Sequence, residues 1–238
     1  MEDLKIIGHV KSCYLDKFGT PRQSGLVADS CAKIILKPEF QPEASLQGLE
    51  EFSHLWIIFL FHKNTNHRFH AKVHPPRLLG ESKGVFATRS PHRPNPIGLS
   101  LVKLEKIENG IIFIKEIDLI DGTPVLDIKP YLPYVESFPE AKSGWAASAK
   151  VLEIEVKFST EAEKELIYFE TKYPEKNFRK LIQDTLKLDP RPVVYRGFEE
   201  EKNSPYRSQH AVRIMDYDIH FEFLSSTEIL VQKISLLP

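Results

Sequence analysis

The pattern of apolar and polar positions divides the chain into two kinds of segment. Up to about residue 130, short apolar runs bounded by turn residues predict strands at 6–10, 55–61, 85–88 and 125–128. The run 55–61 (LWIIFLF) has no polar position, which predicts a strand buried on both faces. Asn109-Gly110 separates two apolar segments, 99–108 and 111–119, and predicts a β-hairpin. Many short strands with little helical period predict a mainly β fold, a barrel or a sandwich.

Beyond about residue 145 the periodicity changes. Apolar residues at helical spacing follow Thr160, where TEAE fits a capping box, and Pro174 ends this first helix. A second amphipathic helix is predicted over 178–186. Residues 211–223 alternate and predict one half-buried strand, with 229–234 as its neighbour. We therefore expect a β-rich domain at residues 4–145 and a smaller α+β domain at residues 146–238.

Composition is that of an ordinary globular protein, with 42% hydrophobic and 27% charged residues and a formal net charge of −1. The charge is unevenly distributed, because residues 62–93 hold seven Lys and Arg side chains against the single acid Glu81. Such a basic stripe attracts a polyanion or an anionic cofactor, although a solvated surface loop would show the same charge pattern.

The two cysteines form no CxxC pair, and the chain has no signal pattern or long apolar run, which favours a cytoplasmic protein without membrane association.

Three loops are stiffened by proline. The loop 89–98 carries three prolines with two arginines, a histidine and an asparagine, which gives a preorganised polar surface. The segments 118–124 (DLIDGTP) and 188–192 (LDPRP) are the other two.

The chain has no glycine-rich nucleotide motif and no nucleophile elbow, which argues against a Rossmann site, a P-loop or a serine hydrolase. His70 and His74 are four apart, but Pro75-Pro76 argues against a helix there, so no metal site is expected.

Several of these strings together resemble the TrmO (TsaA-like) family. The resemblance is carried by PRQ at 21–23, FSHLW at 52–56, GVFATRS at 84–90, RPNPIG at 93–98 and DLIDGTP with DIKPY at 118–131. It is strong over residues 4–145 and looser through 189–192. It implies a small β-barrel that binds S-adenosylmethionine outside any Rossmann fold and acts as a homodimer. It also implies methylation of N6 of threonylcarbamoyladenosine beside the anticodon of tRNA.

The resemblance also implies a set of cofactor-binding residues. They are Pro21, Arg22, Gln23, His62, Lys63, Arg89, Leu99, Leu119, Ile120, Asp121 and Gly122. Among them, Arg22, Lys63 or Arg89 would suit the carboxylate of the cofactor, and Asp121 would suit its ammonium group or its ribose hydroxyls.

The acceptor nitrogen and the tRNA backbone need further groups. Asp127 or Tyr131 is the candidate proton acceptor, because both lie close along the chain to the cofactor turn. Contacts with tRNA phosphates are expected from Lys72, Arg77, Arg93 and Arg191. Two alternatives are a non-catalytic barrel that binds RNA or senses the cofactor, and a histidine-based, metal-dependent hydrolase.

Overall fold

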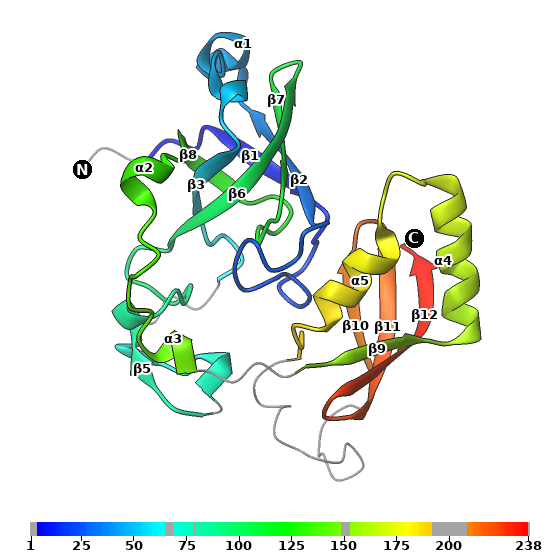
Figure 1. The fold of residues 1–238 in the computed structure, drawn as a ribbon. Helices are drawn as coiled ribbons and strands as arrows, with labels where there is room; N and C mark the ends of the chain where they lie inside the picture. Colours follow the sequence, from blue (N-terminus) through cyan, green and yellow to red (C-terminus); the bar gives the residue numbers. More distant parts are fainter. Residues whose placement is uncertain (1–3, 65–68, 79, 149–152, 192–208, 238) are drawn as a thin grey trace. The chain divides into compact units, whose positions relative to one another are not determined.

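The computed structural model describes residues 4–64, 69–78, 80–148, 153–191 and 209–237. Its N-terminal part is a closed six-stranded barrel in the order β1-β2-β7-β6-β3-β8 (Figure 1). Closure removes the unpaired edges that an open sheet would leave. The strands are β1 (Gly8–Ser12), β2 (Cys31–Leu36), β3 (His54–Leu60), β6 (Ile97–Glu108), β7 (Ile111–Lys115) and β8 (Pro124–Pro130).

The barrel core is filled by alternate residues of these strands. In β3, Leu55, Ile57 and Phe59 are buried, and the residues between them are half-buried on the outer face. The prediction that this strand is buried on both faces is therefore wrong, because closure of the sheet gives each strand one inner and one outer face. The predicted hairpin is confirmed, since β6 and β7 are neighbours joined by Asn109 and Gly110. Both turn residues have positive φ, 51° and 69°.

Short elements connect the barrel strands or follow the last of them, β8. They are η1 (Pro38–Phe40), α1 (Pro42–Ser45), η2 (Leu49–Glu51), β4 (Lys72–Val73), η3 (Pro76–Leu78), β5 (Lys83–Gly84), η4 (Val85–Ala87), α2 (Pro133–Glu136) and α3 (Trp145–Ser148). The two short strands β4 and β5 pair with each other. Residues 85–88, which the apolar pattern predicts as a strand, form the turn η4 instead, because Val85 alone is buried there and Phe86 faces solvent.

The C-terminal part is a four-stranded sheet with two helices beside it (Figure 1). Its strand order is β10-β11-β12-β9, and β12 and β9 are parallel. The stacked rings of Phe169 and Phe178, one from each helix, pack against Tyr217 of the sheet. The elements are β9 (Glu155–Phe158), α4 (Thr160–Lys172), α5 (Phe178–Leu186), β10 (Gln209–Ile214), β11 (Tyr217–Ser225) and β12 (Glu228–Leu236).

Two details differ from the sequence prediction in this part. Residues 211–223 are not one strand, because the chain turns at Met215 and Asp216 and continues as β11. Met215 takes a positive φ of 54°, so the turn forms without glycine. The N-cap of α4 is Ser159 rather than Thr160, since the Ser159 hydroxyl accepts a hydrogen bond from the amide of Ala162 at 3.1 Å. Both predicted helices are present, and the mainly β fold with an α+β tail is confirmed.

The chain forms two compact units, and each of them is built from three separate segments of the sequence. The first unit holds residues 1–10, 33–114 and 122–151, and the second holds 11–32, 115–121 and 152–238. The division into domains at residues 4–145 and 146–238 thus stays a prediction. No helix among the described residues is long and apolar enough to cross a membrane.

Candidate functional site

The DLIDGTP segment is fixed to the end of β1 by a network of hydrogen bonds. Asp121 accepts the amide of Ser12 at 2.8 Å and lies 3.3 Å from the ammonium group of Lys11. The Ser12 hydroxyl donates to the Leu119 carbonyl at 2.6 Å. Leu119 is fully buried, while Asp121 is half-buried. Asp121 is thus already engaged in holding the turn, and any ligand would use its remaining lone pairs.

Two of the cofactor residues implied by the resemblance lie together in the first unit. His62 follows β3, and its Nε2 would lie 3.8 Å from a Cβ built on Gly122. Gly122 is exposed and has a φ of 79°, a conformation that favours glycine. Its amide donates to the Val10 carbonyl at 2.8 Å, which fixes the turn in front of the imidazole. Lys63 and Arg89 of the same unit are exposed.

Leu99 and Asp127 share one row across the outer face of the barrel. Ile58 of β3 pairs with Leu99 of β6 on one side and with Asp127 of β8 on the other. The two residues are thus two strand spacings apart, about 10 Å. Leu99 is 52% exposed, so its side chain offers an apolar contact surface.

The two candidate proton acceptors have different surroundings. The Asp127 carboxylate accepts the amide of Ile128 at 2.9 Å and pairs with Lys129 at 2.9 Å, and its side chain is 46% exposed. Tyr131 lies four residues further along the chain, about 13 Å if extended. Its ring packs edge-on against Trp56 at 6.0 Å. Asp127 therefore shares a row with a predicted cofactor contact, whereas Tyr131 does not.

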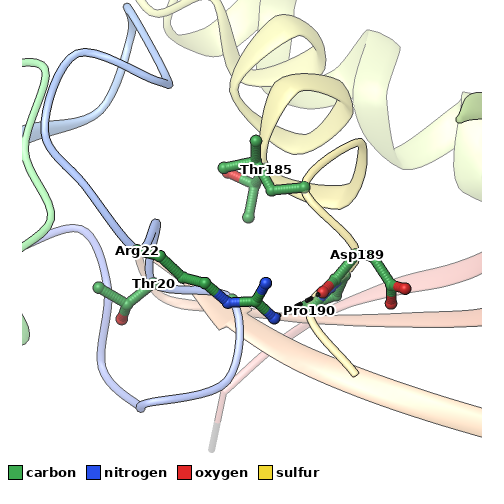
Figure 2. A pocket seen from close by; sticks show the side chains of 7 residues that line it. Thr20, Arg22, Thr185, Asp189 and Pro190 are labelled. Atoms are coloured by element: carbon green, nitrogen blue, oxygen red, sulfur yellow. Dashed lines mark hydrogen bonds between the residues drawn. The ribbon is translucent and has the colours of Figure 1, made fainter. Parts of the chain in front are cut away.

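Arg22 lies in the second unit and lines a small hollow with residues of the LDPRP loop (Figure 2). Its guanidinium donates to the backbone carbonyl of Asp189 at 3.3 Å. Desolvation lowers the pKa of Arg22, and the charge of Asp189 opposes this shift. Pro21 is buried, and Gln23 and Ile120 are half-buried. The hollow is lined by Gly19, Thr20, Arg22, Thr185, Leu188, Asp189 and Pro190.

The four candidate tRNA contacts differ in exposure. Lys72 and Arg77 are exposed, and Arg93 is half-buried. Arg191 is only 7% exposed, and its guanidinium binds both carboxylate oxygens of Asp189, at 2.9 and 3.2 Å. It also lies 3.4 Å from the centre of the Phe223 ring. That Arg191 contacts tRNA phosphates stays a prediction, and in this structure its charge is already paired with Asp189 inside the second unit.

The structure shows further residues of the candidate site that the sequence patterns did not identify. Ser12 and Lys11 hold Asp121, although nothing in the string GHVKS indicates this. Phe86 belongs to the GVFATRS string, but only the structure shows that the residue is 74% exposed and that Arg93 lies against its ring. Among the described residues, no three His, Cys, Asp or Glu side chains are grouped so that they could hold a metal ion.

Two family comparisons cover almost the whole chain. The family described as "tRNA-methyltransferase O N-terminal domain" matches residues 9–137, and the "TrmO C-terminal domain" matches residues 152–236. The chain belongs to the TrmO family. The resemblance stated from the sequence motifs is thus confirmed, and its looser C-terminal part is included.

Relatives of the TrmO family agree with this assignment. The chain is 42% identical over 220 residues to the Escherichia coli (strain K12) protein named "tRNA (adenine(37)-N6)-methyltransferase", which covers 90% of each chain. It is 41% identical to a Pseudomonas aeruginosa protein named "Putative S-adenosylmethionine-dependent methyltransferase RcsF", with 91% and 90% covered. A human protein with the same name as the first is 55% identical over 133 residues, which cover 55% of this chain but 30% of that longer one.

Solved structures of the TrmO family show the same fold over the full length. The "Crystal structure of TrmO" aligns with a TM-score of 0.78 and 34% identity and covers 99% of each chain. The "Crystal structure of TrmO from Pseudomonas aeruginosa" aligns with a TM-score of 0.79 at 34% identity and covers 99% of this chain and 98% of that one.

Proposed function

We propose that this chain transfers a methyl group from S-adenosylmethionine to N6 of adenosine 37 in tRNA. The observation that carries the proposal is the match of both TrmO domains along the chain, together with 42% identity over nine tenths of an E. coli protein named for this reaction. A barrel cofactor site is also consistent with the absence of a glycine-rich Rossmann motif from the sequence.

The residues present fit such a cofactor. An adenosyl group needs hydrogen-bonding partners and an apolar surface, and a methionyl carboxylate needs a cation. In the first unit, the exposed Gly122 turn beside His62 offers backbone groups and an imidazole. Leu99 offers apolar area, and Lys63 and Arg89 offer positive charge. Arg22 and Asp121, which the resemblance also implies, belong to the second unit.

S-adenosylmethionine supplies an electrophilic methyl group when it is bound, so the protein mainly has to position the acceptor and exclude water. The stiff loop 89–98 suits this task, because Phe61 donates its amide to Pro96 and Asn64 donates its side-chain amide to Pro91. These bonds fix the loop against the end of β3. The loop therefore requires little reordering when a substrate binds.

Asp127 is the proton acceptor that we favour within this proposal. The acceptor nitrogen of threonylcarbamoyladenosine lies next to a urea-like carbonyl, so a modest base is enough. Asp127 is partly exposed, so a substrate can reach its carboxylate, and Lys129 holds that carboxylate in place at 2.9 Å. Asp127→Asn should lower kcat by about 10²- to 10⁴-fold with cofactor affinity unchanged. Full turnover in both Asp127→Asn and Tyr131→Phe would show that no side chain at these positions takes the proton.

Three finer features belong to the same proposal. The substrate adenosine carries a threonylcarbamoyl group, the enzyme acts as a homodimer, and it works in the cytoplasm. Cys13 and Cys31 are both present as thiols, which suits a reducing compartment. Light scattering at several protein concentrations would test the homodimer.

The deciding experiment is a methyl-transfer assay. Purified protein and labelled S-adenosylmethionine are mixed with two tRNA pools, one with threonylcarbamoyladenosine and one without it. We expect label only in the modified pool. Label in both pools would reject the requirement for the threonylcarbamoyl group. Cofactor binding without label in either pool would reject the enzyme in favour of a sensor or RNA-binding barrel.

A further inference from the structure

An aromatic ring stands out from the surface of the first unit within the basic stripe. Phe86 is the middle residue of η4 and is 74% exposed. Its neighbour Val85 is 1% exposed and donates its amide to the Ala71 carbonyl at 2.9 Å. The buried Val85 anchors the turn, so Phe86 has to face outward.

One face of this ring is supported by a fixed arginine. The guanidinium carbon of Arg93 lies 5.6 Å from the centre of the Phe86 ring. Arg93 also donates to the Val85 carbonyl at 3.3 Å and to the Thr88 carbonyl at 2.8 Å. Thr88 in turn donates its amide and its hydroxyl to the Val85 carbonyl. The turn, the cation and the ring therefore form one small rigid unit.

The charges of the segment that carries the ring, residues 62–93, favour a polyanion. Lys72 pairs in register with Gly84, two residues before Phe86, and its side chain is exposed. Arg77 and Arg89 are exposed as well, and the one acid of the stripe, Glu81, is paired with Lys83 at 3.2 Å. Single exposed phenylalanines are common on protein surfaces and need no ligand. A ring clamped by a cation, in a segment that carries further exposed cations, has the features of single-stranded nucleic-acid sites, where bases stack on aromatic side chains.

We propose that Phe86 is a stacking platform for an unpaired base of the tRNA anticodon loop, with Arg93 as its support. This proposal rests on the proposed function. Phe86 is then a positioning residue, because a base held on its ring fixes the loop while the acceptor adenosine enters the site. Stacking also offsets part of the free energy that is lost when a loop base leaves its neighbours.

The test compares three replacements of an exposed side chain, so the fold is expected to survive each of them. Phe86→Ala removes the ring, Phe86→Leu keeps apolar bulk without a π face, and Phe86→Trp keeps a larger ring. Each variant is assayed for kcat and KM with tRNA, for cofactor affinity, and for binding of an anticodon stem-loop RNA. Tyr168→Ala is the matched control, since Tyr168 is 59% exposed with Lys172 5.8 Å from its ring centre, but lies on α4 of the other unit.

We expect Phe86→Ala and Phe86→Leu to raise KM for tRNA and the stem-loop Kd by roughly 5- to 100-fold, the usual range for one stacked base. Cofactor affinity should stay the same, and Phe86→Trp should keep wild-type values. The indole fluorescence that Phe86→Trp adds to that of the wild type should be quenched by the stem-loop, and less by a stem-loop with abasic sites in its loop. Tyr168→Ala should behave as wild type.

Either of two results with RNA would overturn the stacking role. One is an unchanged KM and Kd in Phe86→Ala, and the other is equal quenching by the intact and the abasic stem-loop. Failure of the proposed function looks different, because the wild-type protein itself would then transfer no methyl group to tRNA. A change in cofactor affinity in Phe86→Ala would also reject the proposal, since it would place Phe86 in the cofactor site.

Discussion

Two arginines that each precede a proline lie over phenylalanine rings in the two units, and their surroundings are opposite. Arg93 lies over Phe86, whose ring is largely exposed. Arg191 lies over Phe223, which is 3% exposed, and Arg191 itself is 7% exposed. The same local sequence feature therefore gives a surface platform in one unit and part of a core in the other.

The partner of each guanidinium explains the difference. Arg93 donates its hydrogen bonds to the backbone carbonyls of Val85 and Thr88, which carry no net charge, so these bonds do not neutralise it. Arg191 is neutralised by Asp189, which has a φ of 50° and binds both the backbone amide and the side chain of Arg191. A buried charge is tolerated only when it is paired in this way. The comparison predicts a large effect on stability at Arg191 and a functional effect at Arg93.

The largest effect is expected for Arg191→Met. The methionine keeps an apolar stem against Phe223 but leaves the buried Asp189 carboxylate without this cation. The loss in free energy of unfolding should be about 3–5 kcal/mol, measured by urea unfolding of the intact chain. The control is Arg213→Met, because Arg213 is 50% exposed in its pair with Asp218 and should cost less than about 1 kcal/mol. Equal losses in the two variants would show that the Arg191 pair is not effectively buried.

A smaller effect is expected for Arg93→Met. Removal of the clamp should cost about 1 kcal/mol or less of stability, the usual net value of such hydrogen bonds. It should weaken tRNA binding by a few-fold, because a surface cation–π contact contributes about 0.5–1 kcal/mol. The effect should largely disappear in a Phe86→Ala background, since the two residues act as one unit. Additive effects in this double-mutant cycle would separate Arg93 from the platform.

The salt dependence of tRNA binding distinguishes a platform from a phosphate contact. Replacement of a phosphate contact lowers the slope of log K against log salt by about 1. Lys72→Met should therefore lower the slope, because Lys72 is exposed and is a predicted phosphate contact. Arg93→Met should leave the slope nearly unchanged. A reduced slope for Arg93→Met would instead assign Arg93 to a phosphate.

Local signals in the sequence predict the parts of the fold that depend on local geometry. Asn109-Gly110 predicts the β6–β7 hairpin because few other residues accept positive φ at both turn positions. The turn at Met215-Asp216 has no such signal, so the sequence pattern predicts one strand where the structure has the β10–β11 hairpin. β2 has no counterpart among the predicted strands, although its inward residues Ala32, Ile34 and Leu36 are buried in the barrel.

The candidate site shows the same limit. The resemblance supplies the cofactor residues, and the structure places His62 beside Gly122. Neither sequence pattern nor resemblance distinguishes Arg93 from Arg191, because burial depends on the sheet that packs beneath each loop. Phe86 is missed for a related reason. Its exposure follows from a turn that the apolar run 85–88 does not reveal.

The smallest effect concerns His210, which stacks on Phe221 with ring centres 5.5 Å apart. Burial lowers the pKa of His210, the positive charge of Arg191 lowers it further, and Asp189 opposes the shift. The unfolded chain, with a histidine pKa of about 6.5, therefore binds the proton more readily than the folded chain. The contribution of His210 to stability is present above about pH 6.5 and is lost as the pH falls towards its folded pKa.

Urea unfolding between about pH 7.5 and 5.5 checks this prediction, because most carboxylates stay ionised in that range. The wild type should lose more stability on acidification than His210→Gln, and the difference between the two curves belongs to His210. Arg191→Met should reduce the difference, because the charge that disfavours the imidazolium is removed. Parallel curves for wild type and His210→Gln would mean that the imidazole titrates as it does in water. The surroundings of Arg191 would then be more hydrated than its 7% exposure indicates.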